Sequence, residues 1–249
     1  MNSKHVNSYQ ATTALIRAFF EAFTMGIMDS LYPTDDTDKK YNPRNIKQAM
    51  LEHYDQIADA FFMIMFTMFI RLNYRDVADA QQRLTKEFET KKPTMQDYLR
   101  FACKTQKLYD AMVTEYKQNF DYLLRGKFYD VAEYLKQYTH GNQLSVANEP
   151  LAINLMVRTI LKSYTTGIKL SKTKKASLHQ PTILRLLIIN IHLLINDSQL
   201  KPGEANLNEL FLTACGSETN MNVMLNTLDE TYQELIKEEG IVSTNDQSN

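Results

Sequence analysis

Glycine and proline are scarce in this chain, with 7 glycines and 6 prolines among 249 residues. Almost all of them fall where a helix would begin or end, a distribution typical of helical proteins rather than of strand-rich ones. No segment alternates apolar and polar residues over the length that a half-buried strand needs. The shortage therefore argues against a β-rich fold and indicates an all-α one.

Cysteine is rarer still, since only Cys103 and Cys215 occur and they lie far apart in the sequence. Two cysteines do not make a disulfide framework, and their separation lacks the short spacing of a zinc site. The histidines form no ligand pair four residues apart, and the glycines never cluster as they do in a phosphate-binding loop. We therefore expect two buried free thiols, a reducing compartment, no metal and no cofactor.

Long apolar runs are missing too. The two longest, residues 60–70 and 183–195, cover eleven and thirteen residues, whereas a membrane-spanning helix needs roughly 20. Residues 1–10 are polar and cannot serve as the apolar core of a secretion signal. We expect a cytoplasmic protein with no membrane partner, in which both runs form buried core helices.

Apolar residues recur at helical spacing along most of the chain, as at Leu15, Phe19 and Phe23. The pattern predicts an all-α multi-helix bundle of about eight to nine helices, built as one core or as two packed subdomains. Residues 1–92 would form an N-terminal helical subdomain, residues 93–240 a C-terminal helical subdomain, and residues 241–249 a disordered tail. The expected helices cover about residues 8–30, 42–72, 74–90, 94–124 (in one or more pieces), 127–138, 150–167, 181–196, 207–212 and 217–240.

Residues 61–70 are apolar on every side of their predicted helix and rich in phenylalanine and methionine. A helix of this kind is surrounded by protein. Because methionine is flexible and polarizable, it also suits adaptable apolar surfaces. The segment is therefore interpreted first as a core helix, and second as the lining of a ligand pocket or of a dimer interface.

Charge is distributed very unevenly. Residues 150–196 contain no Asp or Glu, and their seven Lys and Arg residues give a formal charge of +7. From residue 197 to the end, ten acidic and two basic residues give −8, while the first 149 residues are balanced. A basic block followed by an acidic block has two physical interpretations, and the sequence leaves both open.

In the first interpretation the two blocks pair within the fold, where each exposed ion pair contributes about 0–1 kcal/mol. In the second, the basic block meets a polyanion such as nucleic acid. Asn154, Arg158 and Lys162 are spaced four residues apart and share one helix face, which leads into a lysine-rich loop. This loop is too long for the turn of a standard helix-turn-helix. The candidate nucleic-acid-binding residues are Arg158, Lys162, Lys169, Lys172, Lys174 and Lys175.

Arg185 and His192 are the candidate catalytic pair. They are seven positions apart with six residues between them, so they lie nearly two turns apart on one face of an otherwise apolar helix. This spacing resembles the Arg-x4-6-His motif of HEPN-type ribonucleases, all-α proteins whose paired Arg and His cleave RNA across a dimer interface. The chain departs from that pattern at Leu186, where the family usually has a polar residue. The resemblance covers these two residues alone and implies RNA cleavage by them.

Three functions follow from these patterns. The first is a non-enzymatic helical regulatory or interaction protein that acts through protein–protein contacts with a partner or with itself as a homo-oligomer. The helical build, the amphipathic last helix and the lack of a catalytic signature favour this function over an enzymatic one. The second is nucleic-acid binding, of the kind found in transcription regulators, through residues 158–175. The third is HEPN-like RNA cleavage.

Overall fold

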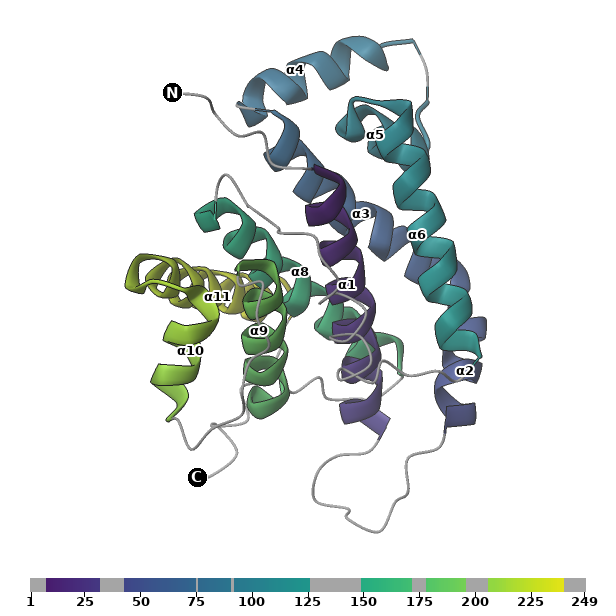
Figure 1. The fold of residues 1–249 in the computed structure, drawn as a ribbon. Coiled ribbons are helices and arrows are strands. Elements are labelled where there is room, and N and C mark those ends of the chain that lie inside the picture. Colours follow the sequence, from purple (N-terminus) through teal and green to yellow (C-terminus); the bar gives the residue numbers. More distant parts are fainter. Residues whose placement is uncertain are drawn as a thin grey trace.

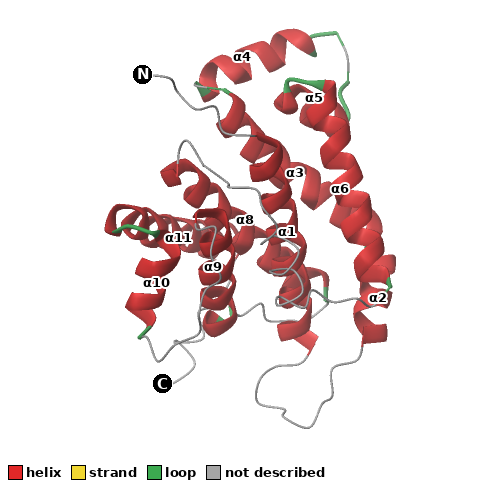
Figure 2. Cartoon of the chain, in the orientation of Figure 1, coloured by secondary structure: helices red, strands yellow, loops and turns green. Residues whose placement is uncertain are grey.

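The structure is a computed structural model of the chain, and it describes residues 8–31, 43–74, 76–90, 92–125, 149–171, 178–195 and 206–239. These residues form ten α-helices and no strand, so the predicted all-α fold is confirmed (Figure 2). The helices are α1 (Ser8–Leu31), α2 (Pro43–Glu52), α3 (Tyr54–Asn73), α4 (Val77–Glu87), α5 (Met95–Cys103), α6 (Gln106–Leu124), α8 (Glu149–Leu170), α9 (Gln180–Ile195), α10 (Leu207–Cys215) and α11 (Glu218–Glu239). The helix expected at 127–138 and the tail expected at 241–249 lie outside the described residues.

Helix α1 is the central element of the fold. It packs most extensively against α8 and also contacts α6 and α9. In Figure 1 α6 lies on one side of it and α9, α10 and α11 lie on the other, while α3 passes behind it. Helix α3 packs against α5 and α8, and α11 packs against α8 and α10. The contacts of α1 with α8 and of α3 with α5 therefore join residues on both sides of the boundary expected at residue 93.

Aromatic side chains from α1, α3 and α6 form the centre of the core. Phe19, Phe20 and Phe61 are fully buried, and Tyr116 is nearly so. The ring centroids of Phe61 and Tyr116 are 4.5 Å apart, and those of Phe19 and Phe61 are 5.1 Å apart at an interplanar angle of 81°. Such edge-to-face contacts add to the free energy gained by burying the rings. The apolar segment of α3 is thus mainly a core helix, as its composition predicts.

Two glycines allow α1 and α8 to approach each other closely. A Cβ atom on Gly26 would lie 2.1 Å from the carbonyl oxygen of Tyr164, and one on Gly167 would lie 2.1 Å from that of Phe23. Both distances are far inside van der Waals contact, so the backbones touch where side chains would normally separate them. Gly26, inside α1, therefore serves a close contact between helices.

Several predicted helix boundaries are wrong: α4 covers Val77–Glu87 instead of 74–90, and α10 continues to Cys215 instead of ending at 212. The helix expected to end at Gly167 continues to Leu170, because this glycine serves the contact with α1 rather than a helix end. The single helix expected over residues 42–72 is interrupted at His53, which lies between α2 and α3 with φ −116° and ψ 24°. No glycine or proline marks this position, so the sequence gives no signal for the break.

Side chains cap α5 and α11, and both cysteine thiols are buried as predicted. The Thr94 hydroxyl accepts from the amide of Asp97 while the Asp97 carboxylate accepts from the amide of Thr94 at 2.9 Å, which is a complete capping box. Ser217 caps α11 by accepting from the amide of Asn220 at 3.2 Å. Cys103 and Cys215 are free and buried. Burial raises the pKa of Cys103 to about 12 and the pKa of Cys215 to about 11, so both thiols stay protonated.

Within the described ranges, no single helix has the length and apolarity needed to cross a membrane, and α3 with α4 meets that requirement only as a pair bent by 118°.

Candidate partner-binding groove

Arg158 occupies the interface between α8 and the acidic helix α11. Its side chain is 9% exposed, and its guanidinium donates two hydrogen bonds to the Glu234 carboxylate, at 2.8 and 3.0 Å, and one to Glu230 at 3.2 Å. The two carboxylates come from consecutive turns of α11 and are 40% and 62% exposed. For Arg158, therefore, the basic and acidic blocks pair within the fold.

Further contacts fasten α11 to α8 beside this ion pair. The amide of Asn154, one turn before Arg158, donates to the hydroxyl of Thr227 at 2.9 Å. Met224 and Leu235 of α11 are fully buried in the same interface region. The face of α8 that the sequence predicts as a positive ridge is thus covered by α11 at two of its three positions.

The remaining candidate basic residues are placed differently. Lys162, the third position of that face, is half-buried, and Lys169 is exposed near the end of α8. Lys172, Lys174 and Lys175 lie outside the described residues. Nucleic-acid binding by residues 158–175 stays a prediction, and it now depends on the lysines rather than on Arg158.

Lys162 borders a groove of about 620 Å³ formed by four helices. Its lining residues are Asp59, Ala60, Met63 and Ile64 of α3, Met95 of α5, Lys162 and Thr166 of α8, and Leu235 of α11. Most of these side chains are apolar, and Met63 is 53% exposed although it belongs to an otherwise buried segment. The groove is therefore an apolar surface that the fold leaves open.

The polar groups of the groove are few. Asp59 contributes a carboxylate from α3 and Lys162 an ammonium from α8. The one hydroxyl, that of Thr166, donates to the carbonyl oxygen of Lys162 at 2.8 Å and is thereby occupied. An apolar floor flanked by one charge of each sign is suited to bind a side chain or a helix, and it offers no nucleophile with a base.

Sequence reasoning found part of this groove. The interpretation of residues 61–70 as the lining of a pocket or interface applies to Met63 and Ile64, and Lys162 was among the candidate basic residues. Leu235 belongs to the apolar face of the predicted amphipathic last helix, whereas Asp59 and Met95 were missed, because only tertiary packing brings them to the groove.

Arg185 and His192, the candidate catalytic pair, lie in different surroundings on α9. Arg185 is exposed, whereas His192 is 3% exposed inside the bundle. Between them, the buried amide of Asn190 donates to the Glu21 carboxylate of α1 at 2.9 Å. The polar stripe of α9 therefore contacts α1 in part, and RNA cleavage by Arg185 and His192 stays a prediction from the motif.

Glu21 provides a test of this α1–α9 contact. Burial raises the pKa of Glu21 above its usual value, while the hydrogen bond from Asn190 and the charge of Arg185 oppose the shift. A carboxyl with a raised pKa binds its proton more tightly in the folded state, so stability decreases as pH rises from the unfolded pKa through the folded one. We expect Glu21→Gln to raise the free energy of unfolding at about pH 8, and to raise it less at about pH 5. Urea unfolding of both proteins measures this difference, and an equal effect at both pH values would contradict it.

Tyr164 joins α8 to the ends of α1 and α9 through a buried network. Its hydroxyl donates to the Asp29 carboxylate at 2.6 Å and accepts from the amide of His179 at 3.3 Å. The His179 ring lies 2.7 Å from the Thr182 hydroxyl and 3.6 Å from Asp29. Burial, followed by the nearby Asp29 charge, raises the pKa of Tyr164 and keeps its proton in place. The network holds three helix ends together rather than presenting a reactive group.

In the part of the chain that the structure describes, no group of three or more His, Cys, Asp or Glu residues is arranged to hold a metal ion. Comparison of the chain with protein-family models, with curated proteins and with solved structures finds no match. The function is therefore argued from the residues and their geometry.

Proposed function

We propose that this protein is a non-enzymatic helical interaction protein that acts through protein–protein contacts, and that its partner at the α3–α5–α8–α11 groove is a second copy of the chain. The single observation that carries the proposal is the open apolar groove around Met63. Its lining supplies contact surface, and the one hydroxyl in it is already engaged with the backbone.

The shape of the groove supports self-association. Met63 projects from α3 with half of its surface exposed, and a cavity of about 620 Å³ lies beside it. In a two-fold dimer the same surface meets itself, so the projecting methionine of one copy enters the cavity of the other. Methionine adapts to such a site because its side chain is unbranched and polarizable.

The charges of the groove support the same arrangement. Asp59 and Lys162 come from two different helices that line it. In the proposed dimer Asp59 of one copy pairs with Lys162 of the other, and two-fold symmetry makes this pairing reciprocal, so that it forms twice. Complementary charges of this kind fix the orientation of an interface more than they add to its affinity.

Introducing a charge at the centre of the groove tests the proposal. We expect the wild-type protein to be a dimer in solution and Met63→Glu to be a monomer, because the new carboxylate would be buried without a partner. Light scattering coupled to size-exclusion chromatography, over a range of protein concentrations, measures the mass of each.

Leu207→Glu is the matched control. Leu207 is 46% exposed on α10 and does not line the groove, so the same change there should leave the dimer intact. A wild-type protein that stays monomeric at every concentration would contradict the proposal. So would a dimer that Leu207→Glu dissociates and Met63→Glu does not.

A further inference from the structure

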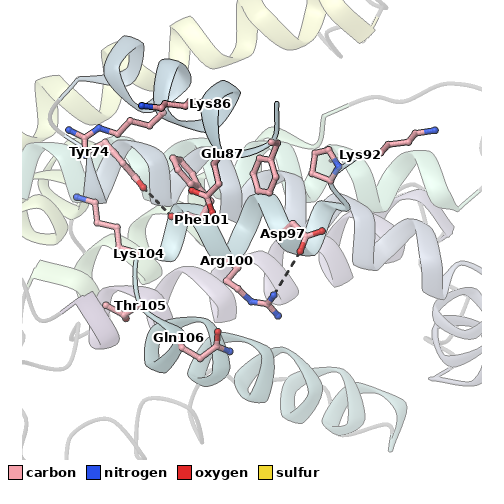
Figure 3. Close-up of a pocket in the computed structure, with 13 residues that line it drawn as sticks. Tyr74, Lys86, Glu87, Lys92, Asp97, Arg100, Phe101, Lys104, Thr105 and Gln106 are labelled. Atoms are coloured by element: carbon pink, nitrogen blue, oxygen red, sulfur yellow. Dashed lines mark hydrogen bonds and ion pairs between the residues drawn. The ribbon is translucent and has the colours of Figure 1, made fainter. Parts of the chain in front are cut away.

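A second pocket, of about 1180 Å³, lies where α4, α5 and α6 meet (Figure 3). Its walls come from the end of α3, the end of α4, the segment before α5, α5 itself and the beginning of α6. Its volume is large enough for a ligand the size of a nucleotide. None of its residues belongs to the groove or to the basic segment 158–175.

The pocket is strongly basic. Its cations are Arg83, Lys86, Lys92, Arg100 and Lys104, and its carboxylates are Glu87 and Asp97, which leaves a formal charge of +3 around one cavity. Several cations that line one cavity give it a positive electrostatic potential, which attracts an anion. In a protein of net charge −1, such a concentration of positive charge is a local feature and not a consequence of composition.

Some of these charges already have partners and others do not. Arg83 pairs with Asp79 at 3.0 Å, and Arg100 lies 3.8 Å from Asp97. Lys86 and Lys92 are exposed, and no ion pair joins either of them to another described residue. Neither lysine is therefore neutralised by a described carboxylate, and Lys92 extends outward at the far end of the pocket from Lys86 and Lys104 (Figure 3).

Lys104 is held toward the pocket by an unusual backbone conformation. It ends α5 with φ 61°, a left-handed conformation that glycine normally supplies at a helix end. Its ammonium donates to the carbonyl oxygen of Asn73 and lies 4.3 Å from the centre of the Tyr74 ring. Lys104 thus adopts a strained backbone conformation that glycine would adopt at lower energetic cost. Its ammonium forms a fixed positive charge in the wall of the pocket (Figure 3).

Aromatic rings form another part of the wall. Tyr74 and Phe101 stack with their centroids 5.4 Å apart and an interplanar angle of 13°, and the Tyr74 hydroxyl donates to the Phe101 carbonyl oxygen. Phe88 also lines the cavity, with its ring held edge-on against Tyr98. All three lining rings are half-buried, so part of each remains open to a ligand.

The combination of cations and aromatic rings identifies the class of ligand. Lysine and arginine side chains bind phosphate oxygens, and α6 begins at the pocket with the positive end of its dipole and no acidic residue in its first turn. Aromatic rings stack with nucleobases without selecting one base. We propose that this pocket binds a nucleoside polyphosphate, with the phosphates near Lys86 and Lys104, which lie at the same side of the pocket in Figure 3, and the base against Phe88.

Replacing Lys86 and Lys92 by glutamate tests whether the positive charge of the pocket binds the phosphates of a nucleotide. We expect the wild-type protein to bind ATP, and Lys86→Glu/Lys92→Glu to bind it at least about tenfold more weakly, because the charge around the pocket changes by four units. Isothermal titration at low ionic strength gives both dissociation constants. The wild-type affinity should also decrease as salt is added.

The control for charge is Lys47→Glu/Lys117→Glu, which makes the same change on exposed residues of α2 and α6 that do not line the pocket. It should leave ATP binding unchanged. Failure of the wild-type protein to bind ATP would overturn the proposal, and so would an equal loss of affinity in the control.

Two further variants test separately the ammonium of Lys104 and the aromatic ring of Phe88. Lys104→Gly removes the ammonium but suits the left-handed conformation, so it should fold normally and bind ATP several-fold more weakly. Phe88→Leu keeps an apolar side chain but removes the ring, so it should weaken ATP binding and leave the binding of inorganic tripolyphosphate unchanged. A wild-type protein that binds tripolyphosphate as tightly as ATP would overturn the assignment of a nucleotide.

Discussion

Replacing either Gly26 or Gly167 by alanine should lower the free energy of unfolding by about 3 kcal/mol. The new Cβ would lie 2.1 Å from a carbonyl oxygen of the facing helix, and that oxygen belongs to rigid backbone rather than to a movable side chain. Helices α1 and α8 must then separate along the most extensive helix contact in the fold. Their separation removes van der Waals contacts from an interior that is packed as densely as a crystal of small organic molecules.

The sign of this effect makes the test decisive. Within an exposed helix, exchanging glycine for alanine stabilises a protein by about 1 kcal/mol. A destabilisation therefore shows close helix contact, whereas a stabilisation would contradict it. Urea unfolding monitored by circular dichroism measures the change, and Gln118→Ala at an exposed position of α6 is the control, with an expected effect within about 0.5 kcal/mol.

Removing the carboxylates of the Arg158 ion pair should lower the free energy of unfolding by a different amount than removing Arg158 itself. In Glu230→Gln/Glu234→Gln the guanidinium stays buried, with its side chain 9% exposed, and loses both compensating charges. We expect a loss of about 3 kcal/mol in the free energy of unfolding, because an unpaired buried charge is costly. Arg158→Met instead leaves two carboxylates that already reach solvent, so we expect a loss of about 1 kcal/mol.

The same unfolding measurement compares the two variants. Glu218→Gln/Asp229→Asn is the matched control, since it removes two exposed negative charges from α11 that form no ion pair with Arg158. It should change the free energy of unfolding by less than about 1 kcal/mol in total. If Arg158→Met proved the more destabilising change, the carboxylates and not the guanidinium would be the costly buried groups.

The fold class could be predicted from the sequence because the patterns that indicate helices involve residues close together in the chain. Helical spacing of apolar residues, proline at the start of α2 and the capping pair Thr94 and Asp97 each depend on neighbouring positions. The errors occurred where tertiary contacts decide the outcome. Gly167 looks like a helix end in the sequence and is a contact with α1 in the structure, and the break at His53 has no sequence signal.

The sites were less predictable for the same reason. The spacing of Asn154, Arg158 and Lys162 correctly predicted a shared helix face, but it could not show that α11 covers two of the three. Pairing with the acidic block was one of two open interpretations, and for Arg158 it is the one found. The basic pocket was not predicted because its positively charged residues are dispersed over residues 83–104. Acidic residues occur between them, so the net charge of this segment of the sequence is not conspicuous.

The pairing of α1 with α8 has a consequence for the synthesis of the protein. The hydrogen bond between Tyr164 and Asp29 spans 135 residues of sequence, and the contacting glycines are separated by a similar length. On the ribosome, α1 emerges first and finds its main neighbour only after more than half of the chain has been translated. Until then the face of α1 around Gly26, which packs on α8, has no partner, so we expect folding to be completed late and nascent chains to depend on chaperones.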